Sequence, residues 1–191
     1  MPSGVTHDRI TLWILPWVTG ITYGLTRSGE LSLILAGGVL FSGMMFGPDL
    51  DINSIQYKRW GIFKPIWLPY RKFLSHRSFL SHGPIIGTCI RLLYLFLIVA
   101  VAGIFAVAIA QLIFGFDWNW HDFVREKYTL LRNQYFRETI VFLIGLEVGA
   151  MSHSFSDWFS SRRKLRHKNK LAKIEAATKK RHGAKIYQKK K

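Results

Sequence analysis

The chain has 191 residues, 49% of them hydrophobic and 15% aromatic, and a formal net charge of +16. Its single cysteine, Cys89, excludes an intrachain disulfide framework and is expected to be a small buried residue. The charge is uneven: residues 162–191 hold 14 Lys and Arg against one acid, whereas residues 1–161 hold 13 against 10. We therefore predict two parts, an apolar body (1–161) and a basic tail (162–191) that is largely disordered in isolation.

Two uncharged apolar segments, residues 10–26 and 31–47, predict a helical hairpin closed by a polar turn. The first segment rises about 25 Å as a helix, which is short for a hydrocarbon core of about 30 Å. The second carries small residues that let helix backbones approach closely in lipid, namely Ala36, Gly37, Gly38, Ser42 and Gly43. We interpret the pair as a transmembrane hairpin, with a buried hairpin of a soluble protein as the alternative.

Residues 92–116 contain no charge and clear the threshold of about 18 apolar residues for a spanning helix. Arg91 precedes this run and is expected to extend to the lipid headgroups. Residues 139–159 predict a fourth span, in which Glu147 is expected to have a structural role. The predicted fold is thus all-α, an integral membrane bundle of about four transmembrane helices.

The connections between spans are also informative. Residues 52–74 interleave bases with aromatic rings, which suits a membrane interface, with a nucleic-acid stacking surface as the alternative. Residues 117–138 predict a charged connection with a short surface helix, in which His121 and Asp122 are treated as loop residues. The first eight residues lack a basic segment, so no cleaved signal peptide is expected.

An even number of spans places both termini on one side of the membrane. That side would carry 21 Lys and Arg, against five on the opposite side. The positive-inside rule therefore predicts that both termini are cytoplasmic.

Histidines and aspartates gather at the predicted cytoplasmic ends of all four spans. The candidate metal ligands are His7, Asp49, Asp51, His76, His82, His153 and Asp157. His153 and Asp157 are four residues apart, on one face of a helix. Helix bundles build metal sites by such convergence, and this ligand set suits zinc, manganese or iron better than copper(I). Taken singly, these residues have other interpretations. His7 is then an exposed terminal histidine, Asp49 and Asp51 form a turn that ends a helix, and His76 and His82 contact lipid headgroups.

Four motifs carry a resemblance to a known family. They are Thr6-His7-Asp8, Gly47-Pro48-Asp49-Leu50-Asp51, His76-Arg77-Ser78-x-x-Ser81-His82-Gly83, and His153-x-x-x-Asp157. The combination resembles an uncharacterised family of metal-binding membrane proteins common in cyanobacteria. It is more distantly similar to inner-membrane metal-dependent hydrolases under SOS control. The resemblance implies a helical membrane protein with a metal site, located in a bacterial plasma or thylakoid membrane, and a remote link to zinc-dependent phospholipase C and P1-type nucleases.

The favoured function is a metal-dependent hydrolase of phosphoesters or lipid headgroups. Seven candidate ligands exceed what one four-coordinate zinc needs, so we expect two metals, or one metal with Asp51 left as a general base. Arg77 would hold the substrate phosphate. The alternative is a non-catalytic, metal-stabilised scaffold whose basic tail binds anionic lipid or nucleic acid. A transporter fits less well, because the ionisable groups cluster at one end. The pattern does not predict the substrate or the oligomeric state.

Overall fold

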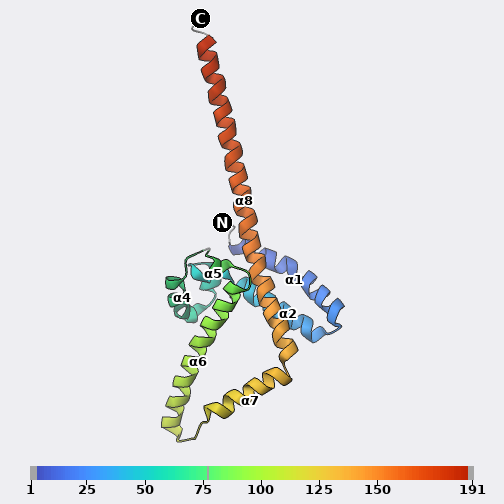
Figure 1. The fold of residues 1–191 in the computed structure, drawn as a ribbon, viewed down its shortest axis with the longest axis vertical. Helices are drawn as coiled ribbons and strands as arrows, with labels where there is room; N and C mark the ends of the chain where they lie inside the picture. Colours follow the sequence, from blue (N-terminus) through green and yellow to red (C-terminus); the bar gives the residue numbers. More distant parts are fainter. Residues whose placement is uncertain (1–3, 77, 189–191) are drawn as a thin grey trace.

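The computed structural model describes residues 4–76 and 78–188, and within them every regular element is helical. Helices α1 (Gly4–Thr26) and α2 (Gly29–Met44) form a hairpin, and α8 (Phe136–Gln188) packs along α2 (Figure 1). Five short helices follow α2: η1 (Pro48–Asp51), α3 (Ile55–Lys58), η2 (Gly61–Trp67), α4 (Leu68–Phe73) and α5 (Phe79–His82). The all-α prediction is confirmed.

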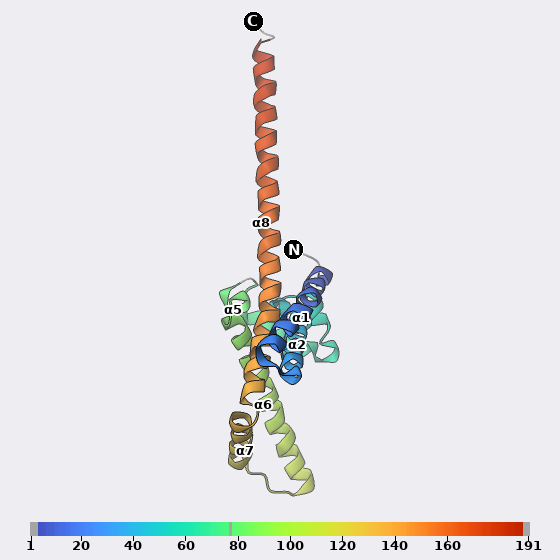
Figure 2. The ribbon, with the colours of Figure 1, turned by 90° about the vertical axis from the view of Figure 1, so that its right-hand side faces the viewer.

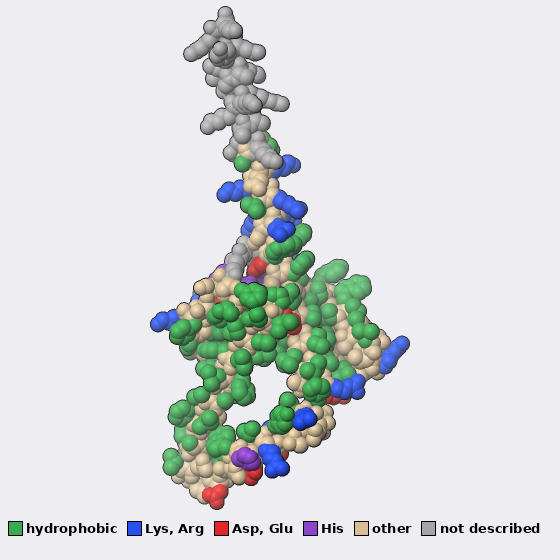
Figure 3. All heavy atoms as spheres, in the orientation of Figure 1, with side chains coloured by type: hydrophobic (Ala, Val, Ile, Leu, Met, Phe, Trp, Pro, Cys, Tyr) green, Lys and Arg blue, Asp and Glu red, His purple; other side chains and the backbone are tan. Residues whose placement is uncertain are grey.

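Helix α6 (Ile86–Phe114) leads away from this body, and α7 (Trp120–Asn133) connects its far end to the start of α8 (Figure 1). None of the residues in α7 is buried, as expected for a surface helix. Cys89, in the first turns of α6, is exposed, so its predicted burial is wrong. The first turns of α6 pack against the body, where Gly87, Thr88 and Arg91 are buried. Figure 3 shows hydrophobic side chains along the rest of α6, and many of them, such as Phe96, Phe105 and Leu112, are exposed.

Close packing of α2 against α8 depends on glycine. A Cβ on Gly145 would lie 2.5 Å from the carbonyl oxygen of Leu35, and one on Gly38 would lie 2.8 Å from that of Phe142. These approaches confirm the predicted role of Gly38 in helix contact. The same prediction is wrong for Gly37, which has nothing within 4 Å of an added Cβ because it faces away from both neighbouring helices.

The core is built from the connection between α2 and α6 together with one residue of α8. Its buried members are Phe46, Leu50, Tyr57, Trp67, Tyr70 and Leu146. Trp67 is fully buried, and its ring makes an edge contact with that of Tyr70, with centroids 5.5 Å apart. Three of the rings that we expected at a membrane interface therefore pack inward instead. The cause is the fold of residues 55–73 into short helices that cover the end of α2.

Three helical segments are long and apolar enough to cross a membrane: Gly29–Asp51, Ile86–Phe114 and Phe136–Ala172. The first predicted span, within α1, is not among them in the described part of the chain. Helix α1 includes His7, Asp8 and Arg9 and is less apolar than α2. The count of four spans thus stays a prediction.

Helix α8 is a single helix that extends far beyond the body (Figure 2). It contains the fourth predicted span and, after it, residues 162–188 of the predicted basic tail. Disorder was expected for the isolated tail, and this expectation stays a prediction.

Candidate metal centre

Four separate segments bring histidine and aspartate side chains to one place. His7 lies near the start of α1, Asp49 and Asp51 lie in η1, and His82 ends α5. His153 lies in the first half of α8, and its ring stacks on that of His7 near the start of α1. The structure thus brings the predicted residues together at the end of the bundle where the sequence pattern placed them.

The first cluster consists of His7, His153 and Asp157, all buried. The rings of His7 and His153 are stacked with their centroids 3.7 Å apart. Nε2 of His7 lies 3.4 Å from one carboxylate oxygen of Asp157, and Nε2 of His153 lies 3.8 Å from the other. The stacked rings and the Asp157 carboxylate thus bring two imidazoles and one carboxylate to the same buried place, and imidazole is a common metal ligand.

The second cluster consists of Asp49, His76 and His82, which are partly buried. In each of the two clusters, one ligand atom from every member lies within 4.8 Å of the others. Imidazole nitrogens and carboxylate oxygens at such spacing can close around one divalent cation with small side-chain movements.

Asp49 joins the two clusters. Its Oδ2 lies 3.2 Å from Nε2 of His153, and its Oδ1 lies 3.7 Å from Nε2 of His82. One carboxylate therefore faces a histidine of each cluster. A carboxylate in this position can bridge two metal ions, which in two-metal hydrolases lie about 3.5–4 Å apart.

In three of the histidines, His76, His82 and His153, a neighbouring polar group contacts the Nδ1 atom of the ring. Oδ1 of Asp51 lies 2.9 Å from Nδ1 of His76, and Oγ of Ser81 lies 2.7 Å from Nδ1 of His82. The side-chain amide of Gln56 faces Nδ1 of His153 at 3.4 Å. Metal-binding histidines usually have such a partner on the nitrogen that does not bind the metal. Ser81 belongs to one of the sequence motifs, but no role was assigned to it there. Gln56 escaped the sequence analysis, because no spacing pattern marks it.

Arg91 lies inside the protein next to the second cluster. The prediction that its side chain extends to the lipid headgroups is therefore wrong. Arg91 is 1% exposed, and its guanidinium donates to the carbonyl oxygen of Ser81 at 2.8 Å and to Thr88 Oγ1 at 3.0 Å. The carbonyl end of α5 needs donors, and a guanidinium supplies them inside the protein. Glu147 accepts from the backbone N–H of Ile85 at 2.9 Å, in keeping with its predicted structural role.

Some polar residues that the sequence analysis considered do not belong to the two clusters. Arg77 lies outside the described residues. Asp8 is next to His7 but binds the guanidinium of Arg59, which raises the pKa of Arg59. His121 and Asp122 lie in the first turn of α7 and are exposed, not in a loop as expected. Near the centre, burial raises the pKa of Tyr70, so its phenol stays protonated at neutral pH.

The centre opens in two directions. A polar pocket of about 230 Å³ is lined by His7, Asp49 and His153 together with residues of α1 and α3, including Lys58. A groove of about 550 Å³ is lined by His82 and Asp157 together with apolar residues of α8. The candidate centre therefore has solvent access from both sides.

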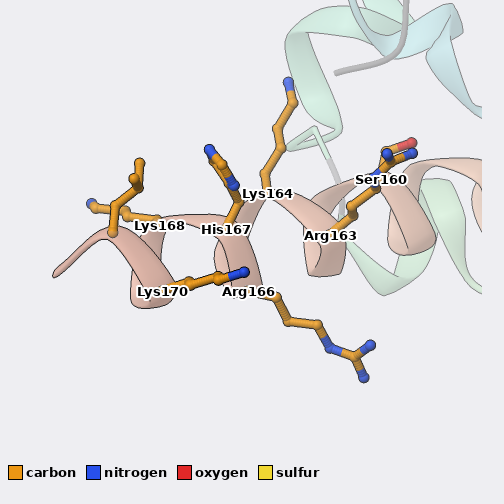
Figure 4. Close-up of a pocket in the computed structure, with 8 residues that line it drawn as sticks. Ser160, Arg163, Lys164, Arg166, His167, Lys168 and Lys170 are labelled. Atoms are coloured by element: carbon orange, nitrogen blue, oxygen red, sulfur yellow. The ribbon is translucent and has the colours of Figure 1, made fainter. Parts of the chain in front are cut away.

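Basic side chains follow on α8 beyond the centre. A surface hollow of about 710 Å³ is lined mainly by Arg163, Lys164, Arg166, Lys168 and Lys170. Figure 4 shows that these side chains point in different directions around the helix and do not converge on one point. The segment is thus a charged surface, distinct from the convergent histidines and aspartates.

The donor set fits a metal. Within the part of the chain that the structure describes, buried atoms without a hydrogen-bond partner include His7 Nδ1, Asp49 Oδ1, His76 Nε2, His82 Nε2, His153 Nε2 and Asp157 Oδ1. Four of these atoms have only the His–Asp contacts given above, and burying polar atoms with so few partners is costly unless another group, such as a cation, binds them. Fold and site together define a helical protein with a candidate His/Asp metal centre.

Comparison with known families agrees with this class. Residues 2–167 match the family described as "Uncharacterized metal-binding protein (DUF2227)", and the chain belongs to this family. No curated protein and no solved structure matches the chain.

Proposed function

We propose that this protein is a metal-dependent hydrolase of phosphoesters that acts at the cytoplasmic surface of a bacterial plasma or thylakoid membrane. The observation that carries the proposal is the position of Asp49 between two His/Asp clusters. A shared carboxylate of this kind is typical of two-metal hydrolytic sites. Zinc is the expected metal because the ligands are imidazoles and carboxylates, and manganese or iron would also fit.

A divalent metal, when bound, would supply Lewis-acid activation of water and of the phosphoryl oxygen. His7, His153 and Asp157 would hold one ion, and His76 and His82 would hold the other. Asp49 would contribute one oxygen to each. The buried partners of the rings, such as Asp51 and Ser81, would keep the Nε2 atoms directed at the ions.

The polar pocket would receive the substrate phosphate. Lys58 lines this pocket together with Asp49 and His153 and offers a mobile ammonium to an anionic group. Asp8 also lines it, but Arg59 already pairs with that carboxylate. Lys58 is thus the basic residue that lines the described pocket, in the role that the sequence analysis gave to Arg77.

Asp51 is better suited to positioning His76 than to general-base catalysis. Its side chain has no exposure and lies against the Nδ1 atoms of His76 and His82, at 2.9 and 3.9 Å. A general base must reach a water near the substrate, whereas Asp51 lies behind the rings that would face it.

Membrane embedding rests on the three long apolar segments, and the basic segment of α8 would lie on the cytoplasmic side. There it would attract anionic headgroups, with nucleic acid as the other candidate partner. In the alternative function, a non-catalytic scaffold, the metals would only tie α1, η1, α5 and α8 together.

The test is turnover of a phosphoester panel by detergent-purified protein, stripped of metal and then reloaded with zinc, manganese or iron(II). Methyl p-nitrophenyl phosphate and p-nitrophenyl phosphate should both be screened. We expect metal-dependent release of p-nitrophenol that Asp49→Asn abolishes and Asp122→Asn, at an exposed position of α7, retains. Full metal loading without release from any ester of the panel would contradict the hydrolase and favour the scaffold.

A further inference from the structure

The two openings of the metal centre differ in chemistry. The polar pocket is bordered by Asp8, Asn53, Ser54 and Lys58. Besides His82 and Asp157, the groove is bordered by the apolar residues Pro84, Met151, Phe155 and Trp158 and by two serines, Ser154 and Ser161. A molecule that reaches across the centre would therefore meet charged and amide groups at one end and hydrocarbon and aromatic surface at the other.

From this contrast we infer that the substrate is an amphiphilic phosphoester whose hydrocarbon chain lies in the apolar groove while its polar end enters the pocket of Lys58. The inference rests on the proposed function and names the substrate class of the same site. It is based on the contact between the groove and the metal centre: His82 and Asp157 belong both to the metal clusters and to the wall of the groove.

One face of α8 builds the groove wall. Met151, Phe155 and Trp158 recur at helical spacing, and the rings of Phe155 and Trp158 are stacked with centroids 5.7 Å apart. These rings are 63% and 48% exposed, so they offer an apolar surface that the described chain leaves open. The guanidinium of Arg162 lies 4.2 Å from the centre of the Trp158 ring, so a positive charge stands next to one of the groove's aromatic residues.

The position of the groove also favours a lipid-like chain. Pro84 precedes α6, the most apolar candidate span, and the α8 wall lies within another candidate span. A chain leaving the hydrocarbon core beside these helices would reach the groove before it reached water. The volume of about 550 Å³ lies in the usual range of ligand pockets.

The reaction would be hydrolysis at phosphorus. A water oxygen forms a bond to phosphorus, the bond from phosphorus to the ester oxygen breaks, and a water proton passes to the departing oxygen. A diester gives a phosphomonoester and an alcohol. No oxidant, reductant or second substrate besides water is required.

Binding of alkyl phosphates tests the chain site without turnover. The dissociation constants of methyl, butyl and hexyl phosphate would be measured by calorimetry on zinc-loaded protein in detergent. We expect hexyl phosphate to bind at least about tenfold more tightly than methyl phosphate, since each fully buried methylene contributes about fourfold and the groove is partly open.

Two variants of α8 distinguish binding of the alkyl chain in the groove from its partitioning into the detergent. Phe155→Ala with Trp158→Ala should reduce the chain-length effect to about twofold while methyl phosphate binds as before. Phe159→Ala is the matched control, because Phe159 is 59% exposed on the same helix but does not line the groove. It should keep the full effect.

The outcomes distinguish the two proposals. Equal affinity for all three alkyl phosphates, or the same chain-length effect in wild type and the double variant, would overturn the chain site even if methyl p-nitrophenyl phosphate is hydrolysed. A chain-length effect confined to the groove, in a protein that hydrolyses no ester of the panel, would leave the chain site standing and remove the hydrolase.

Discussion

The carboxylate of Asp51 lies 2.9 Å from Nδ1 of His76, and its side chain is fully buried. The other ring nitrogen of His76, Nε2, has no hydrogen-bond partner in the described structure. His76 forms the second cluster together with Asp49 and His82. An aspartate on the rear nitrogen fixes the orientation of the ring and makes the opposite nitrogen a better ligand. Asp51 thus has a different place from Asp49, although the two residues share one turn of η1.

Asp51→Asn should therefore weaken metal binding and spare the chemical step. We expect the affinity for zinc to fall about 10- to 100-fold, as for other partners of metal-bound histidines. With metal saturating, kcat should change little. If Asp51 were instead the general base, kcat would fall by about 10²- to 10⁴-fold at any metal concentration. Metal titrations and kcat at saturation decide between the two roles, with Asp122→Asn on the exposed helix α7 as control.

Gly145→Ala should destabilise the protein by about 1–3 kcal/mol, because the added Cβ would lie 2.5 Å from the carbonyl oxygen of Leu35 in α2. Gly37→Ala is the matched control. It lies in the facing helix with nothing within 4 Å of an added Cβ, so it should be neutral or slightly stabilising. Unfolding in detergent measures both, and equal stabilities would show that α2 and α8 are not so closely packed.

Lys58→Ala should raise KM for a phosphoester about fivefold, equivalent to roughly 1 kcal/mol, with little change in kcat. The reason is its position on the wall of the polar pocket, where an exposed and solvated ammonium contributes modestly to anion binding. Lys72→Ala is the control, since Lys72 is exposed on α4 and lines none of the pockets described here. Steady-state kinetics on both variants test this, and an unchanged KM for Lys58→Ala would remove Lys58 from the site.

Much of this arrangement could be predicted from the sequence. Runs without charge indicated the long helices, and the depth of each polar residue along its helix indicated a common end for His7, Asp49, His82 and His153. The spacing of His153 and Asp157 placed them on one face, and both contribute to the first cluster.

The contacts of individual side chains could not be predicted, because they depend on the direction in which each side chain points. A position along a helix fixes how far a residue lies from the end but not which neighbour it faces once helices pack. Arg91 was therefore assigned to the headgroups although it points to the carbonyl of Ser81. Likewise, Gln56 reaches His153, 97 residues away, through contacts that no local pattern records. The division into two clusters arises only when α1 and α8 pack against the η1 region.

The most direct measurement is the metal content of detergent-purified protein by elemental analysis, in wild type and in His7→Ala, His76→Ala and Asp49→Ala. Two clusters joined by one carboxylate predict about two equivalents in wild type, about one in each histidine variant, and almost none in Asp49→Ala. A well-folded wild type that takes up no metal, or an Asp49→Ala protein that keeps both ions, would contradict the shared centre.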